Sequence, residues 1–551
     1  MSTTKVSAET IAAAEILAGV QYSAAERAIM ADNLAGQIAL AKARRGVSLP
    51  VDLPPATLFD PRLPGWKAPL ATGFHPVEQT APPLPSDEAD LAFAPLSTLG
   101  AWFRSGALSS LRLTEIYLRR IAQYGSRLQC IATVTADHAR EQARRADALL
   151  ARGTWLGPLH GMPWGCKDII DTAGIVTGWG AEPWRDRVPQ SDAVVVQRLN
   201  DAGAVMVAKT AVGALAYGDI WYGGVSRNPW NLDEGSSGSS AGSASGVAAG
   251  LFAFALGTET LGSIVAPSER CGTIGLRPTF GRVARTGVMP LSWTLDKVGA
   301  IARTVEDAAL VLAAIDGDDP GDLCSIAAPL NYDAARSLDG LRLGYYAADF
   351  PPGAEGAIDQ RVLEAARELG MTLVPLEREA LPYDALMNVV FAEAAASFES
   401  LTLDGRDDQL TWQDAGAWPN AFRKARFLSA VDHIQLDRLR RLVMMQMDAV
   451  FGRVDCIIGP SMGPMLIITN FTGHPCLTLR SGFLELETRG ALSLANARIA
   501  TEKSRAGALH SVPHSISLWG RLFDEGTLLA VGRGLERKLD VWDRRPALAP
   551  E

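Results

Sequence analysis

The chain has 551 residues, enough to bury a large core and, at about 150 residues per domain, to form up to about three domains. Apolar residues make up 48% and charged residues 21% of the chain, which excludes a disordered, a collagenous and a coiled-coil protein. The net charge of −9 argues against a general nucleic-acid binder, which would carry a basic face.

The cysteines and the apolar stretches bear on metal binding and location. The six cysteines are scattered, with no CxxC or Cys/His cluster, so we expect reduced, buried thiols and no metal site. The N-terminus has no basic stub followed by an apolar run, and the longest apolar stretch, residues 247–256, is too short to span a bilayer. We therefore expect a cytoplasmic protein with no membrane partner.

The first segment, residues 1–48, is predicted to be helical. Ser23 and Glu26 form a capping-box pattern, and apolar residues from Ile29 onward recur at roughly helical spacing. Gly46 can end this helix. Two short helices cannot bury much apolar surface alone, so we expect them to dock on the main body or on another subunit.

The second segment, residues 49–96, is predicted to be an extended connector that wraps the core. Eleven prolines lie between residues 50 and 95, and proline disfavours both helix interiors and central strands. The connector should be ordered, because it also carries apolar side chains: Leu58, Phe59, Leu63, Trp66 and Phe74.

From about Ser97 onward, helical patterns alternate with short β-rich runs, which indicates an α/β layered domain. No second Pro- or Gly-rich linker of similar length follows, so we expect residues 97–551 to form one large domain. The clearest elements are helices at 110–124 and 135–152 and strands at 204–208, 341–345 and 456–459.

A Gly/Ser-rich run, residues 235–246, stands out in composition. A flexible linker is one interpretation, but the run leads directly into a buried-looking apolar segment. It lacks the lysine and spacing of a phosphate-binding loop. Gly238 to Gly242 match the GxSxG nucleophile elbow with Ser240 as the nucleophile, although a run so rich in Gly and Ser produces this match by chance.

Upstream, Lys167 lies in the mostly uncharged run GMPWGCKD (161–168). Such a setting suits a desolvated, neutral lysine. The alternative is an ordinary surface pair between Lys167 and Asp168.

These segments, taken in order, resemble the amidase signature family over most of residues 97–551. The matching motifs are GMPWGCKD, GVSRNPWN (224–231), GSSAGSASGVAAG (238–250), ALGTETLGSIVAP (255–267), CGTIGLRPTFGRV (271–283) and SWTLDKVGAIARTVEDAALVL (292–312).

The resemblance implies a fold and a catalytic group. The fold is a three-layer α/β/α sandwich around a large mixed sheet, here with an N-terminal helical extension. The catalytic group is a Ser–cis-Ser–Lys triad of Lys167, Ser239 and Ser263, with a cis peptide bond at Gly238–Ser239. The implied oxyanion hole is formed by the backbone amides of Thr260, Leu261, Gly262 and Ser263, and no metal or organic cofactor is implied.

The residue types suit hydrolysis of a linear C–N amide bond through a Ser263 acyl-enzyme. A serine hydroxyl needs a base to attack an amide, and desolvation can keep a lysine neutral enough to serve. The Ser239 hydroxyl can both donate and accept, so it can relay a proton between Ser263 and Lys167. Backbone amides stabilise the tetrahedral oxyanion.

The sequence departs from the commonest family pattern at three positions. Glu259 stands where Asp is usual, Leu261 where Gly is usual, and Val265 where many members have Arg. The intact triad still predicts hydrolysis, whereas a carboxylate-bearing substrate that depends on that Arg is less expected.

Tryptophans concentrate between residues 155 and 230. Packing in the core is the simpler interpretation of these tryptophans. A more specific hypothesis is that they form an aromatic-walled pocket for an apolar or aryl amide. The residues proposed for this pocket are Trp164, Trp179, Trp221 and Tyr222.

Rival functions remain open at this stage. One is the A-type subunit of a tRNA-dependent amidotransferase, another is an inactive scaffold that retains the triad, and a third is an esterase using Ser240. The N-terminal segment also loosely resembles small accessory subunits that wrap such amidase-type subunits. We expect a small-molecule amide as the binding partner and no nucleic acid, and a homodimer stays open.

Overall fold

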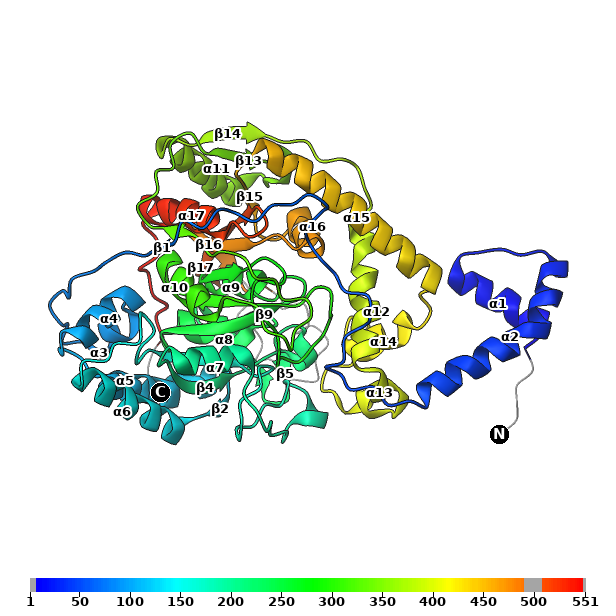
Figure 1. The fold of residues 1–551 in the computed structure, drawn as a ribbon, viewed down its shortest axis with the longest axis horizontal. Coiled ribbons are helices and arrows are strands. Elements are labelled where there is room, and N and C mark those ends of the chain that lie inside the picture. The colour runs from blue at the N-terminus through cyan, green and yellow to red at the C-terminus, as the bar shows by residue number, and fades with distance from the viewer. Residues whose placement is uncertain (1–5, 490–507, 549–551) are drawn as a thin grey trace.

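An eleven-stranded mixed sheet runs through the body of the protein in the computed structural model, which describes residues 6–489 and 508–548 (Figure 1). In sheet order the strands are β14 (Thr372–Pro375), β13 (Arg342–Tyr345), β15 (Cys456–Pro460), β17 (Leu509–Gly520), β16 (Cys476–Glu487), β10 (Ile274–Arg277), β11 (Lys297–Ala302), β9 (Phe254–Glu259), β3 (Pro163–Lys167), β4 (Val205–Thr210) and β2 (Ile131–Val134).

The site-bearing part of this sheet is the parallel trio β9–β3–β4. Trp164 pairs with Phe254 and Cys166 with Leu256, so β3 and β9 run in the same direction and end at the same edge. On its other side β9 pairs antiparallel with β11, where Glu259 faces Lys297 in the register. The expected mixed α/β sheet is confirmed.

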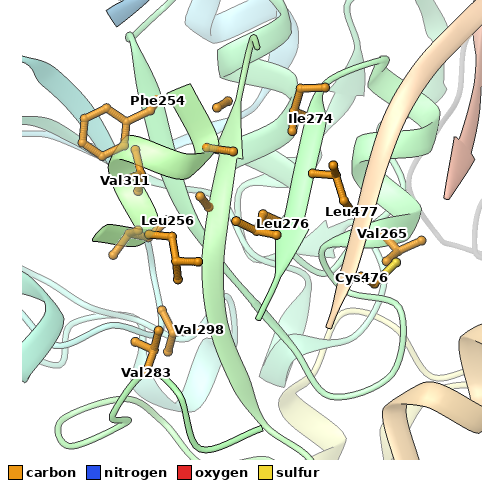
Figure 2. Close-up of a cluster of buried hydrophobic side chains, with 14 of the residues drawn as sticks. Phe254, Leu256, Val265, Ile274, Leu276, Val283, Val298, Val311, Cys476 and Leu477 are labelled. Carbon is orange, nitrogen blue, oxygen red and sulfur yellow. The ribbon is translucent and has the colours of Figure 1, made fainter. Parts of the chain in front are cut away.

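Helices cover both faces of the sheet. Because successive strand residues point to opposite faces, Phe254 and Leu256 of β9 pack in one apolar cluster with Val311, whereas Ala255 packs in another with Val247. Figure 2 shows part of the first cluster, which includes Phe254, Leu256, Leu276, Val298 and Val311. This two-sided burial is what makes the fold three-layered.

The helices before the Gly/Ser-rich run are α1 (Ala8–Ala18), α2 (Ala24–Arg45), α3 (Glu88–Phe93), α4 (Leu96–Arg104), α5 (Ser110–Leu128), α6 (Ala136–Ala151) and α7 (Val194–Asp201). Those from that run onward are α8 (Ala241–Ala248), α9 (Val265–Cys271), α10 (Val305–Ile315), α11 (Gly353–Glu368), α12 (Met387–Ser397), α13 (Glu399–Leu403), α14 (Trp418–Ala425), α15 (Ala430–Arg453), α16 (Pro464–Thr472) and α17 (Glu525–Leu539).

Short elements complete the fold. Three two-stranded sheets pair β1 (Phe74–His75) with β12 (Tyr332–Asp333), β5 (Ile220–Trp221) with β6 (Gly224–Val225), and β7 (Arg227–Asn228) with β8 (Asn231–Gly235). Single 3₁₀ turns lie at Glu182–Trp184, Ala214–Ala216, Ala347–Asp349, Tyr383–Leu386 and Arg406–Gln409.

The helices and strands that the sequence predicts in the body are confirmed. The predicted helices at 110–124 and 135–152 are α5 and α6, and the predicted strands at 204–208, 341–345 and 456–459 are β4, β13 and β15. All six cysteines are free and buried.

The N-terminal helices form a hairpin rather than packing on the body. The predicted capping box is present, with Ser23 N–H donating to Glu26 at 2.6 Å. Arg27 of α2 binds Glu15 of α1 at 2.7 Å, and Figure 1 shows the hairpin projecting away from the sheet. Between the described part of the hairpin and the body, the ion pair Arg44–Glu399 forms at 2.6 Å. Docking on the body or on another subunit was expected, and docking on another subunit stays a prediction, as do the domain limits at 48 and 96.

The connector lies over the body as an ordered strap. Phe59 packs against Phe280 with ring centroids 5.1 Å apart, Thr72 N–H donates to Asn331 at 2.7 Å, and β1 pairs with β12. One expectation needs correction, because α3 lies within the connector. The stretch between Pro85 and Pro95 contains no proline, so nothing there prevents a helix.

Among the helices of residues 6–489 and 508–548, none is long and apolar enough to cross a bilayer.

Candidate active site

Lys167 is the last residue of β3 and its amine lies at the carboxyl edge of the parallel trio. The Nζ atom lies 2.7 Å from Thr258 Oγ1, 2.9 Å from Ser239 Oγ and 3.0 Å from Ser240 Oγ, within hydrogen-bond distance of all three. It also lies 3.3 Å from the carbonyl oxygen of Thr258. Strand pairing with β9 and the turn before α8 thus bring these residues to one point.

The environment of Lys167 favours the neutral amine. The side chain is fully buried and forms no ion pair with any residue that the structure describes. Burial lowers its pKa well below the usual lysine value, and the charges of Asp296 and Glu259 only partly oppose this effect. The alternative of a surface pair with Asp168 does not hold, since Asp168 instead accepts from Gly178 N–H at 2.9 Å.

Ser239 follows a cis peptide bond, as the resemblance implies. The bond Gly238–Ser239 is cis, and Ser239 is almost completely buried. A Cβ atom at position 238 would lie 1.9 Å from the carbonyl oxygen of Gly218, so only glycine fits there. Residues 236–240 of the Gly/Ser-rich run therefore form a closely packed turn and residues 241–246 begin α8, so the run is not a flexible linker.

Ser240 has a structural environment. Its hydroxyl donates to the carbonyl of Thr258 at 3.1 Å and accepts from Thr258 N–H at 3.1 Å and from Lys167. Its backbone N–H donates to the carbonyl of Ser263 at 3.1 Å, which ties the two serine segments together. A fully buried hydroxyl with these bonds does not match an exposed elbow nucleophile.

Ser263 lies in the turn between β9 and α9. It keeps 8% exposure, and its hydroxyl forms no hydrogen bond to another described residue. Glu259 holds this turn: one carboxylate oxygen accepts from the N–H groups of Ile264 and Val265 at 2.8 and 2.9 Å, and the other binds Arg277 at 2.7 Å.

The buried carboxylate of Glu259 is ionised. Burial opposes its charge, but Arg277, Lys297 and the Val265 N–H outweigh burial and lower the pKa of Glu259 to about 2. Glu259 is therefore negatively charged at neutral pH.

The loop 260–263 is anchored by Asp296. Thr260 Oγ1 donates to one oxygen of Asp296, and the other oxygen accepts from Leu291 and Ser292 N–H at 2.7 and 2.9 Å. Gly262 adopts a φ of +88°, which favours glycine. Leu261 is partly buried against the main core.

A cavity of about 140 Å³ lies beside this loop. Thr258 and Thr260 connect it to the Lys167 cluster, and Arg285 and Asp322 form an ion pair at 2.9 Å in its wall. Connector residues also border it, through Asp52 and Pro54. Its apolar wall is formed by Ile169, Ala216, Val288, Met289, Leu291, Trp293, Val298 and Leu323.

The four aromatic residues proposed for a pocket are not among the residues lining this cavity. Trp164 is fully buried and stacks on Phe254, with centroids 6.0 Å apart, and Trp179 lies 5.2 Å from Trp184. Trp221 donates from Nε1 to the carbonyl of Gln129 at 3.1 Å. The hydroxyl of Tyr222 lies 3.4 Å from the carboxylate of Asp168, which follows Lys167 in the chain.

Three residues of the site were not singled out from the sequence for their roles. Thr258 binds the amine of Lys167, Glu259 holds the turn of Ser263, and Asp296 holds Thr260. All three lie inside motifs that carry the resemblance. Each of the three also has a partner in a different motif, namely Lys167, Arg277 and Thr260, so their roles become visible only in the fold.

The chain belongs to the Amidase family, whose model matches residues 112–467. Curated relatives bear the name of the A-type subunit of glutamyl-tRNA(Gln) amidotransferase. The relative from Roseiflexus castenholzii is 34% identical over 472 residues, covering 80% of this chain and 95% of its own length. A relative from Anaeromyxobacter sp. strain K is also 34% identical, over 81% of this chain and 96% of its own length.

Solved structures place the fold in the same family. A peptide amidase from Stenotrophomonas maltophilia matches with a TM-score of 0.69 and 28% identity, over 83% of this chain and 98% of its own. An aryl acylamidase of the amidase signature family matches at 20% identity with a TM-score of 0.69, over 82% of this chain and 99% of its own, and shows the fold alone. The amidase signature fold implied by the motifs is thus confirmed.

Proposed function

We propose that this chain cleaves a linear C–N amide bond through an acyl-enzyme on Ser263, with Ser239 as the proton relay and Lys167 as the base. The observation that carries this proposal is the fully buried amine of Lys167, held 2.9 Å from Ser239 Oγ with no ion-pair partner among the described residues. A lysine in that setting can be neutral, as a base must be.

The proton and bond changes balance as follows. Neutral Lys167 takes the proton of Ser239 while Ser239 takes that of Ser263, and Ser263 Oγ forms a bond to the amide carbon. The tetrahedral intermediate collapses as Lys167 returns its proton through Ser239 to the leaving nitrogen, and the C–N bond breaks. Water then attacks the ester by the same relay, which releases the carboxylate and restores the Ser263 hydroxyl.

Backbone N–H groups of residues 260–263 form the oxyanion hole in this proposal. Two buried carboxylates support their preorganisation, because Asp296 fixes the start of the loop and Glu259 fixes its end. Donors fixed in advance stabilise developing negative charge more effectively than donors that must reorganise.

The substrate is proposed to be a small-molecule amide. The cavity of about 140 Å³ is bordered by Thr258 and Thr260 but by none of Lys167, Ser239 and Ser263, so its volume sets no limit on the acyl group. The aromatic pocket of Trp164, Trp179, Trp221 and Tyr222 finds no support in the lining of this cavity.

The second candidate is an amidotransferase A-type subunit, and the names of the curated relatives favour it over a free-standing amidase. These relatives align over 95–96% of their own length, so the similarity extends across whole subunits. Position 265, however, carries a fully buried valine where many family members have an arginine. An arginine there could bind the carboxylate of glutamine or of a similar substrate, and the valine cannot. Both candidates share the same acyl-transfer chemistry.

An assay of the purified chain separates the candidates. A panel of short-chain amides, anilides, carbamates, esters and glutamine is incubated with the chain alone. Turnover of short neutral amides supports the free-standing amidase, whereas turnover of glutamine that rises on adding an amidotransferase partner supports the second candidate. Labelling of a single serine by a fluorophosphonate excludes the inactive scaffold, and its complete absence contradicts the proposed chemistry.

The N-terminal hairpin supports a protein partner, which we propose to be a second copy of this chain in a cytoplasmic homodimer. Ile16, Ile29 and Leu40 are 82%, 66% and 75% exposed, although such side chains are usually covered in a stable protein. The hairpin's exposed ion pair with the body, Arg44–Glu399, contributes little energy.

A further inference from the structure

A second cavity, of about 120 Å³, lies at the far ends of the two helices that begin at the serines. Helix α8 starts directly after Ser240 and α9 soon after Ser263. Their last turns reach the cavity through Ala248 and Cys271, and residues 542–545 of the C-terminal segment border it as well. It shares no lining residue with the cavity beside Lys167.

Arginines dominate the charge of this cavity. Four of them line it, against one carboxylate, which belongs to Asp543. Arg545 pairs with Asp90 at 2.7 Å, but Arg303, Arg480 and Arg544 form no ion pair with any described residue. Buried or clustered cations normally have an anionic partner, so this lining has an excess of positive charge.

Buried hydrogen-bond donors at the cavity have no partner in the part of the chain that the structure describes. Arg480 is 8% exposed and Thr273 is 2% exposed, and neither Arg480 Nε nor Thr273 Oγ1 bonds to a described residue. Arg303 Nε is buried and unpartnered in the same sense. An unpaired buried donor costs free energy, and a ligand that accepts hydrogen bonds removes that cost.

The other atoms of the two guanidinium groups are held in place by backbone carbonyls. Arg480 donates to the carbonyls of Arg544 at 3.1 Å and of Trp542. Arg303 donates to the carbonyls of Phe252 at 2.8 Å and of Ala94 at 3.0 Å. The guanidinium groups of Arg303 and Arg480 are therefore held in place before a ligand binds, which lowers the entropy cost of binding.

From this geometry we infer that the cavity binds a phosphate group through Arg303, Arg480, Arg544 and the hydroxyl of Thr273. Guanidinium groups match phosphate oxygens in shape and charge. A phosphate dianion also neutralises more of the positive charge of these arginines than a carboxylate monoanion does. The cavity of about 120 Å³ is large enough for a phosphate group. Free inorganic phosphate and the phosphate of a monoester share this chemistry.

Electrostatics around Arg480 agree with the inference. Burial, together with the charge of Arg544, lowers the pKa of Arg480 to about 10. Two acids lie behind the arginines, Asp307 and Glu536, and burial raises their pKa values to about 6 and about 8. At neutral pH Glu536 is therefore mostly protonated and offsets little of the charge of Arg480, whereas Asp307 is mostly ionised and offsets part of the charge of Arg303.

Calorimetry on the full chain tests the inference with inorganic phosphate, glycerol phosphate as a monoester, and acetate as a monoanion. We expect one binding site per chain for inorganic phosphate or for glycerol phosphate. The compound with the lower Kd shows whether the site takes free phosphate or a phosphate monoester. The melting temperature should rise with the concentration of the bound compound. Thr273→Val and Arg544→Gln should each weaken binding about tenfold, since a hydrogen bond to a charged group contributes about 1.5–3 kcal/mol.

Arg441→Gln is the matched control, because Arg441 is exposed and lies on a different cavity. It should bind phosphate as the wild type does. Three results would overturn the inference: no heat and no thermal shift with excess phosphate, equal affinities in the wild type and the Thr273→Val and Arg544→Gln variants, or acetate binding as tightly as phosphate. None of these depends on amide hydrolysis.

Discussion

Replacing Lys167 by methionine removes the proposed base while keeping most of the volume of the side chain. The amine has four contacts, the shortest to Thr258 Oγ1 at 2.7 Å, and it contacts the relay hydroxyl of Ser239 at 2.9 Å. Without it no described group remains to take the proton of Ser239. General-base catalysis contributes about 10²–10⁴-fold, so kcat/KM for a short neutral amide should fall by about that factor.

Lys209→Met is the matched control. Lys209 is equally buried on the neighbouring strand β4, but its amine donates to the carbonyl of Ile170 and to Thr177 Oγ1 at 2.9 Å, away from the serines. It should lose stability and keep its kcat/KM per folded molecule. Measuring melting temperature alongside activity separates the two effects.

The pH profile gives a second readout. Because burial lowers the pKa of Lys167, kcat/KM of the wild type should rise with pH and level off below the ~10.4 of an ordinary lysine. The unfolded chain binds a proton that the folded chain lacks, so this residue lowers stability at acidic pH, and the penalty fades as pH rises towards ~10.4. Near wild-type turnover by Lys167→Met would refute the role of Lys167 as the base. A wild-type kcat/KM that rises only around the ordinary lysine pKa of ~10.4 would refute it as well.

Two further predictions concern Glu259 and the N-terminal hairpin. Glu259→Gln leaves the buried Arg277 without its ion-pair partner, so urea unfolding should show a loss of about 3–5 kcal/mol, and the wild type should lose this contribution as pH falls from about 4.5 towards 2. An unchanged unfolding midpoint would contradict the role of this pair. Deleting residues 1–48 should leave kcat/KM unchanged and convert a dimer into a monomer in sedimentation; an unchanged mass would show that the hairpin does not mediate assembly.

Local sequence patterns predicted the helices and strands of the body, whereas the grouping of Lys167 with the serines came from the resemblance to the amidase signature family. Lys167 ends the buried strand β3, Ser239 lies in the turn before α8, and the Lys167 amine lies 2.9 Å from Ser239 Oγ. The glycine at position 238 of the Gly/Ser-rich motif has a structural reason, because a side chain there would collide with the carbonyl oxygen of Gly218.

Other features depend on contacts between distant parts of the chain, which no local pattern contains. The tryptophans near residues 155–230 include Trp164, whose ring faces the core because its strand is covered on both sides. The partners of Glu259 include Asn470, 211 residues away in sequence. The amphipathic helices of the hairpin predicted docking on the body or on another subunit, because amphipathicity does not say which surface covers them.

The central claim is that Ser263 carries the acyl group, and mass mapping of a trapped adduct tests it most directly. The enzyme is inactivated with a fluorophosphonate, digested, and the labelled peptide sequenced by mass spectrometry, with Ser263→Ala and Ser240→Ala treated in parallel. The account predicts one adduct, on Ser263, absent from Ser263→Ala and retained in Ser240→Ala. An adduct on Ser240, or labelling that survives in Ser263→Ala, would contradict it.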